Sequence, residues 1–148
     1  MATTIQEKKH EGPVQVLRTA DPIDQAYLIL RTGFTVAPIL FGLDKFFNLM
    51  VQWPVYLAPW LNRLAGTAQE FMYVVGVIEI VAGIVVAVKP KFGGYLVAAW
   101  LAGIVVNLLT YAPAKYYDIA LRDFGLLLAA LALARLATGI ERRKTVRV

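Results

Sequence analysis

The stretch MYVVGVIEIVAGIVVAV, residues 72–88, is apolar except for one carboxylate, Glu79, at its centre. With its flanking residues it is long enough to cross the roughly 30 Å hydrocarbon core of a bilayer as an α-helix. Gly76, Glu79 and Gly83 share one helical face, so the carboxylate lies between two small residues where another helix can approach closely. A charge at mid-bilayer costs about 2.5–3.5 kcal/mol on insertion scales, which predicts that Glu79 faces a partner rather than lipid.

Glu79 has two interpretations that this stretch does not separate. It either pairs with a cation and fixes a helix bundle, or it serves as a proton or substrate site. Arg31, in an earlier apolar stretch, is the cation that we expect to meet it, because the two differ in depth by about 6 Å at 1.5 Å per residue. An extended arginine spans that distance, and the sequence therefore predicts a buried Arg31–Glu79 ion pair.

The composition is typical of a membrane protein and excludes several other classes. Hydrophobic residues make up 59% of the 148 residues, above the usual 45–50% or so of soluble domains. The net charge of +5 comes from basic residues at the edges of apolar segments, which is the pattern of membrane orientation and not of nucleic-acid binding. The chain has no cysteine and one histidine, outside the apolar segments. We therefore expect no cofactor held covalently or by His or Cys, and no metal site, and leave quinone or lipid as candidate ligands.

Four apolar segments predict an all-α integral membrane bundle of four transmembrane helices. The expected domain organisation is a polar tail at residues 1–24, a membrane domain at 25–138 and a basic tail at 139–148. Asp21-Pro22 is typical of a helix start. The third span carries Gly94, Ala98 and Ala102 at four-residue intervals, a face of small residues suited to helix packing. We place the four spans at residues 26–49, 67–88, 93–111 and 117–138.

The first span carries a polar stripe that we expect to face the bundle interior. Its members recur at i, i+4, i+7, i+11 and i+14, which brings them to one side of a helix. Pro38 removes one backbone hydrogen bond in mid-helix, so a kink is expected there. The stripe consists of Arg31, Thr35, Pro38, Gly42 and Lys45.

Residues 51–69, between the first and second spans, form an amphipathic loop. Trp53, Tyr56 and Trp60 recur at helical spacing, and Pro54 and Pro59 are expected to break the segment into short turns. Tryptophan and tyrosine favour the membrane–water interface, where this loop is expected to lie. A substrate lid is the alternative.

Charged and polar residues gather near the outer ends of three spans. They either neutralise one another and join the helices, or they line a polar pocket under the loop, suited to a quinone headgroup or a small oxyanion. This predicted outer cluster consists of Asp44, Lys45, Asn107, Arg122 and Asp123. Arg135, near the inner end of the fourth span, is expected to extend to the headgroups.

Lysine and arginine are distributed unevenly between the two sides of the predicted bundle. Nine lie in the two tails and in the turn at residues 89–91, whereas Arg63 and Lys115 lie on the opposite side. The positive-inside rule then predicts a multi-pass protein of the bacterial inner membrane with both termini cytoplasmic.

Four motifs resemble the DoxX/DoxD-like family of small four-helix membrane proteins. They are FGLDKFF at residues 41–47, WPVYLAP at 53–59, GVIEIVAG at 76–83 and YYDIALRDFG at 116–125, preceded by Arg31. The resemblance covers about residues 26–137 and implies an association with membrane oxidoreductases, thiosulfate:quinone oxidoreductase among them. The family's charged positions map onto Arg31, Asp44, Lys45, Glu79, Arg122 and Asp123. This chain lacks a cysteine that would hold a sulfur intermediate.

Together these observations predict an accessory or structural subunit, without catalytic residues, of a larger membrane electron-transfer complex, respiratory or photosynthetic. Its expected partners are membrane lipids and the other subunits. The alternative is the membrane subunit of a quinone-linked oxidoreductase that binds quinone or a small anion at the predicted outer cluster.

Overall fold

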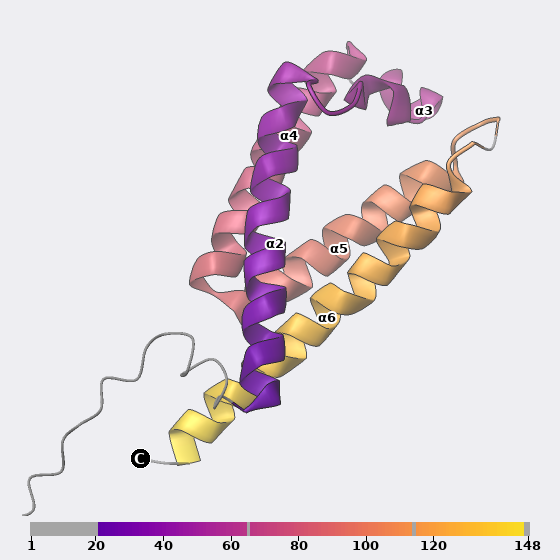
Figure 1. The fold of residues 1–148 in the computed structure, drawn as a ribbon. Helices are drawn as coiled ribbons and strands as arrows, with labels where there is room; N and C mark the ends of the chain where they lie inside the picture. Colours follow the sequence, from indigo (N-terminus) through magenta and orange to yellow (C-terminus); the bar gives the residue numbers. More distant parts are fainter. Residues whose placement is uncertain (1–20, 65, 114, 147–148) are drawn as a thin grey trace, which may run out of the picture.

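The computed structural model describes residues 21–64, 66–113 and 115–146, and helices are the only regular elements in these ranges. The predicted all-α class is confirmed for them. Residues 1–20 of the expected polar tail (residues 1–24) and the last two residues of the expected basic tail lie outside the described ranges. The helices, drawn in Figure 1, are α2 (Pro22–Phe47), η1 (Trp53–Tyr56), α3 (Pro59–Asn62), α4 (Ala68–Val88), α5 (Pro90–Leu109) and α6 (Tyr117–Val146).

Local capping explains where the long helices begin. The Asp21 carboxylate accepts a hydrogen bond from the Ile23 backbone N–H at 3.0 Å, and proline occupies the first turn. The predicted start at Asp21-Pro22 is confirmed, so α2 begins four residues before the predicted span. Thr67 and Glu70 form a reciprocal capping box at the start of α4.

Helix α6 is longer than the predicted fourth span. It continues through residues 139–146, which we expected to form a basic tail. Glutamate, arginine and lysine are good helix formers, and no proline interrupts this segment. The helix therefore carries Arg142, Arg143 and Lys144 of the expected tail.

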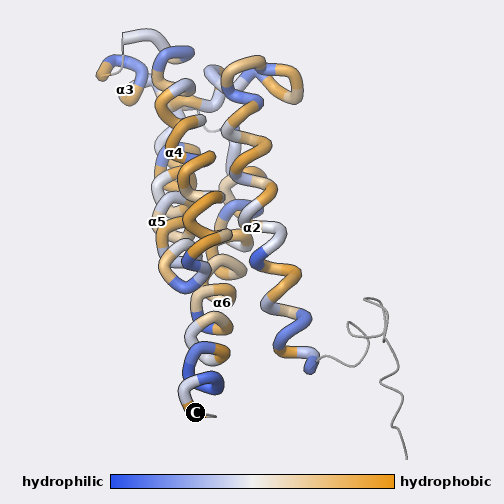
Figure 2. The backbone as a smooth tube through the Cα atoms, turned by 90° about the vertical axis from the view of Figure 1, so that its left-hand side faces the viewer, coloured by the Kyte–Doolittle hydropathy of each residue, from blue (hydrophilic) through white to orange (hydrophobic). Residues whose placement is uncertain are grey.

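Three helices, α2, α4 and α5, are long and apolar enough to cross a membrane. In α4 the side chains of Val74, Val77 and Val81 are about half exposed, whereas Glu79 is 8% exposed. Apolar residues thus face outward and the charge faces inward, the reverse of a helix on the surface of a soluble protein. Figure 2 shows the apolar colouring along α4 and the hydrophilic C-terminal end of α6. These features indicate a membrane protein.

The four long helices form two closely packed antiparallel pairs, α2 with α4 and α5 with α6. At Gly76 an added Cβ would lie 2.6 Å from the Gly42 carbonyl oxygen, and at Gly83 2.7 Å from that of Thr35. The predicted polar stripe of α2 therefore faces α4, as expected. At Gly94 an added Cβ would lie 2.9 Å from the Ala130 carbonyl oxygen, which confirms the small-residue face of α5.

The two pairs diverge toward one end of the molecule, and residues 48–62, the bridging segment, lie across that end (Figure 1). This segment holds η1 and α3, each with a proline in its first turn. The predicted interruption at Pro54 and Pro59 is confirmed. Leu57 is buried and packs with Met72 and Val75 of α4.

Adding a methyl group where α2 and α4 touch is expected to destabilise the protein. Gly76→Ala forces the two backbones apart, because the new methyl group would meet the Gly42 backbone and not a flexible side chain. Overpacking of this kind costs about 1–3 kcal/mol, measurable by unfolding in mixed micelles. Gly103→Ala is the matched control, since a Cβ there meets nothing within 4 Å. Equal losses for both variants would show that the close approach is not required.

Candidate functional site

A buried ion pair joins α2 to α4. The Lys45 ammonium nitrogen lies 2.6 Å from Glu79 Oε2, and the two side chains are only 4% and 10% exposed. The same ammonium lies 3.7 Å from the centre of the Trp53 ring, a cation–π contact. Glu79 thus faces a cation, as its position in an apolar stretch requires.

The predicted Arg31–Glu79 pair is wrong. Arg31 instead donates a hydrogen bond to the Ala87 carbonyl oxygen at the end of α4. The contacts of Gly42 with Gly76 and of Thr35 with Gly83 place Glu79 level with residue 39 of α2. Arg31 is eight residues from that level, about 12 Å, and Lys45 is six residues away, about 9 Å.

The direction of the side chains also favours Lys45 over Arg31 as the partner of Glu79. Helical side chains lean toward the N-terminus of their own helix, so in an antiparallel pair Lys45 and Glu79 lean toward each other. Arg31 leans away from Glu79.

Asp44, adjacent to Lys45, holds the start of the bridging segment. Its carboxylate accepts hydrogen bonds from the backbone N–H groups of Leu49 and Met50 at 3.0 and 3.1 Å, and from Trp53 Nε1 at 2.7 Å. The Asp44 side chain is therefore occupied by three donors of the bridging segment. These bonds fix the indole that covers the Lys45 ammonium.

Asn107 of α5 holds the other part of the bridging segment. Its amide donates to the Tyr56 carbonyl oxygen and accepts from the Ala58 backbone N–H, both at 2.9 Å. Trp60 Nε1 donates to the Thr110 hydroxyl at 3.0 Å. The bridging segment is thus attached to α2 at one end and to α5 at the other.

The aromatic residues of the bridging segment differ in exposure. Trp53 and Tyr56 are half-buried against the bundle, whereas Trp60 is 46% exposed. Tyr56 also contacts the ring of Tyr116, at 4.9 Å between ring centres. Burial and the neighbouring tyrosines raise the pKa of the Tyr116 phenol above its usual value, so that group remains a neutral donor.

Asp123 of α6 is buried, with 10% of its side chain exposed, and lies close enough to Glu79 for the two carboxylates to interact. Its one cation in the described structure is the neighbouring Arg122, whose Nε lies 3.4 Å away and whose side chain is 68% exposed. The Trp100 indole nitrogen beside Glu79 is buried and makes no hydrogen bond of good geometry. Part of this region therefore keeps unused hydrogen-bonding capacity.

The residues of the predicted outer cluster have different hydrogen-bond and ion-pair partners. Lys45 turns to Glu79, Asn107 binds the bridging segment, and Arg122 pairs with Asp123. These partners differ from the mutual neutralisation across three helices that the sequence suggested. We name the four buried ionisable residues the charge cluster: Asp44, Lys45, Glu79 and Asp123.

Sequence reasoning missed Gln69 and Trp100. Gln69 Nε2 donates to the Lys45 carbonyl oxygen at 3.0 Å, and its Oε1 accepts from Asn48 at 2.9 Å. A polar amide in the first turn of an apolar helix was the available signal, as was an indole N–H in the middle of the third span. Among the described residues, no group of three or more His, Cys, Asp or Glu side chains is arranged to hold a metal ion.

Comparisons of the chain with models of protein families, with curated proteins and with solved structures find no match. The resemblance to the DoxX/DoxD-like family therefore stays an expectation that rests on the quoted motifs.

Removing one member of the Lys45–Glu79 pair is expected to cost more than removing both. Glu79→Leu leaves an unpaired ammonium in an apolar interior, at about 3–5 kcal/mol of unfolding free energy, whereas Lys45→Met with Glu79→Leu leaves no charge behind. Unfolding in mixed micelles measures the difference. Arg31→Met combined with Glu79→Leu is the matched control and is expected to give additive losses. A double Lys45/Glu79 variant no more stable than Glu79→Leu would contradict the pair.

Loss of the Asn107 amide is expected to loosen the bridging segment while the helices persist. Asn107→Leu keeps the side-chain size and leaves the Ala58 N–H and the Tyr56 carbonyl without partners. Hydrogen exchange of residues 53–62 is then expected to rise at least about tenfold, the equivalent of 1.4 kcal/mol. Gln52→Ala, which loses a single exposed bond at 3.5 Å, is the control. Unchanged exchange in Asn107→Leu would remove Asn107 from this role.

Proposed function

We propose that this chain is a non-catalytic accessory subunit of a larger membrane electron-transfer complex, respiratory or photosynthetic. The observation that carries the proposal is how the charge cluster is used. Lys45 and Glu79 bind each other, and Asp44 binds three donors of the bridging segment. Groups engaged in this way fasten helices together and are not free to bind a substrate.

The proposed arrangement has four spans, with α6 as the fourth, in the bacterial inner membrane. Supporting it, α6 packs along α5 over most of its length and carries an alanine- and leucine-rich middle. The distribution of lysine and arginine supports cytoplasmic termini. The bridging segment then lies at the outer interface, where Trp60 and the partly buried Trp53 and Tyr56 are the interfacial residues.

Two features support association with other subunits. Gly33, Gly103 and Gly125 lie in α2, α5 and α6, and a Cβ added at any of them meets nothing within 4 Å. These positions leave room for the close approach of further helices. The resemblance to the DoxX/DoxD-like family supports a membrane oxidoreductase as the partner complex.

A second function, the membrane subunit of a quinone-linked oxidoreductase, is supported by the unused groups beside Glu79. The Trp100 N–H lies beside Glu79 but makes no hydrogen bond of good geometry, and Asp123 has only a weakly held, exposed cation. A quinone headgroup accepts hydrogen bonds and a quinol donates them, so this pair of groups suits either form. In this function Asp123 contacts the headgroup.

Extraction from native membranes in a mild detergent through a C-terminal tag tests the accessory role. Stoichiometric cytochrome, chlorophyll-binding or dehydrogenase subunits are expected, identified by mass spectrometry and an absorption spectrum. Recovery of the chain alone, or only with its own copies, would contradict the role.

Two variants separate the two functions in the recovered complex. If the chain is an accessory subunit, Lys45→Met lowers assembly and turnover together, and Asp123→Asn leaves both within about twofold, because it removes no fastening contact. If it binds quinone, Asp123→Asn abolishes turnover while the complex still assembles.

A further inference from the structure

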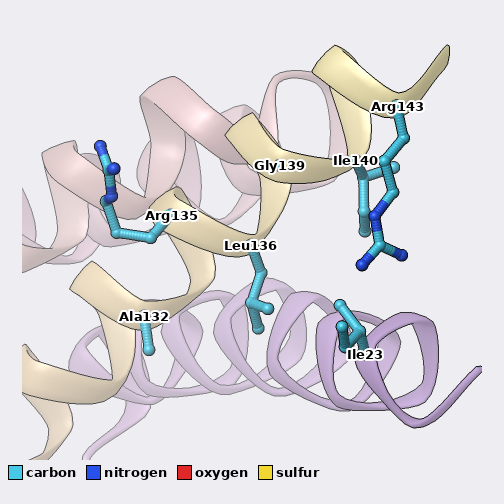
Figure 3. A pocket seen from close by; sticks show the side chains of 7 residues that line it. All are labelled: Ile23, Ala132, Arg135, Leu136, Gly139, Ile140 and Arg143. Carbon is cyan, nitrogen blue, oxygen red and sulfur yellow. The ribbon is translucent and has the colours of Figure 1, made fainter. Parts of the chain in front are cut away.

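A groove lies between the C-terminal part of α6 and the start of α2, at the end of the molecule opposite the bridging segment (Figure 1 and Figure 3). The groove has a volume of about 550 Å³ and is bordered by Ile23 of α2. Its apolar floor comes from α6 residues that share one helical face, Ala132, Leu136 and Ile140. The groove thus offers an apolar channel along a helix.

Gly139 leaves the floor of the groove open. A Cβ built at this position meets nothing within 4 Å, so no neighbouring side chain fills the space above it. The surroundings of Gly139 therefore accommodate a larger side chain without a clash. A narrow, flexible hydrocarbon chain fits a groove of this kind better than a polar ligand does.

Two arginines lie along the same groove, eight residues apart, or about 12 Å along the helix axis. Figure 3 shows the Arg143 guanidinium extending toward Ile23 across the groove. Arg143 pairs with Asp21 at 3.2 Å, but both side chains are nearly half exposed, and such pairs are weak. Arg135 has no hydrogen bond or ion pair with any described residue. The groove therefore keeps an excess of positive charge.

We propose that this groove binds an anionic phospholipid. The phosphate is held by Arg143 through charge-assisted hydrogen bonds, and one acyl chain follows Ile140, Leu136 and Ala132. Arg135, about 12 Å farther along α6, adds positive charge near the groove without contacting the phosphate. Charge complementarity selects this occupant, because an apolar channel beside two guanidinium groups matches a lipid with a net negative headgroup. With the cytoplasmic termini proposed above, the groove lies in the cytoplasmic leaflet, and this placement alone rests on the proposed function.

Native mass spectrometry of the full-length protein in a mild detergent tests the proposal, with dioleoyl phosphatidylglycerol as the probe and dioleoyl phosphatidylcholine as the neutral comparison. Phosphatidylglycerol is expected to bind at least about tenfold more tightly. Arg143→Gln is expected to weaken it about fivefold, and Arg135→Gln to weaken it by less, because Arg135 does not contact the phosphate. Arg142→Gln is the matched control, since Arg142 does not line the groove.

Gly139→Leu supplies a variant that keeps every charge. It fills the floor of the groove and is expected to lower phosphatidylglycerol binding about tenfold without loss of helicity, because the site has room for the side chain. Equal affinity for the two lipids, equal loss in Arg142→Gln, or full binding in Gly139→Leu would each overturn the proposal. Competition by millimolar inorganic phosphate without a requirement for the acyl chain would also overturn it, since the ligand would then be an anion and not a lipid.

Discussion

The Lys45–Glu79 ion pair is the interaction on which the rest of the bundle depends. Two charges taken out of water lose several kcal/mol of solvation each, and only a short contact of good geometry offsets that loss. The 2.6 Å separation exists because Gly42 and Gly76 let the backbones of α2 and α4 meet. Larger residues at either glycine would separate the helices and with them the charges. The close packing of α2 against α4 and the pairing of Lys45 with Glu79 therefore depend on each other.

The same constraint places the bridging segment. Asp44 and Lys45 are consecutive, so their side chains leave the helix about 100° apart and serve different partners. Lys45 turns toward α4, while Asp44 turns toward the end of its own helix and collects the N–H groups of the segment that follows. The Trp53 ring, held by Asp44, then covers the Lys45 ammonium. Fastening the loop and shielding the buried charge are therefore achieved by the same contacts.

Periodicity made most of the fold predictable. The stripe from Arg31 to Lys45 and the small residues around Glu79 define the faces that pack, because a helix in an apolar solvent exposes apolar side chains and buries polar ones. The partner of Glu79 was not predictable in this way. It depends on the register between two helices and on which way each side chain leans. The observed register places Arg31 about 12 Å from the level of Glu79, twice the expected separation of about 6 Å. The partners of Asn107 could not be predicted for another reason. They are backbone groups of a loop, which no pattern of side chains reveals.

The two helix pairs are held together differently from the helices within each pair. Within a pair, glycines bring the backbones into contact along much of the length, as Gly76 does on Gly42 and Gly94 on Ala130. Between the pairs, backbone contact is made near the turn from α4 to α5, where Gly93 lies against the Val86 backbone. A small apolar core around Val86 and Leu133 joins the ends opposite the bridging segment, and the bridging segment spans the diverging ends. Less free energy is needed to break hydrogen bonds between side chains and a loop backbone than to separate two closely packed helices. Any change in the angle between the two helix pairs must therefore break the hydrogen bonds of Asn107 first. The Lys45–Glu79 ion pair joins α2 to α4 and so moves as a unit with these two helices.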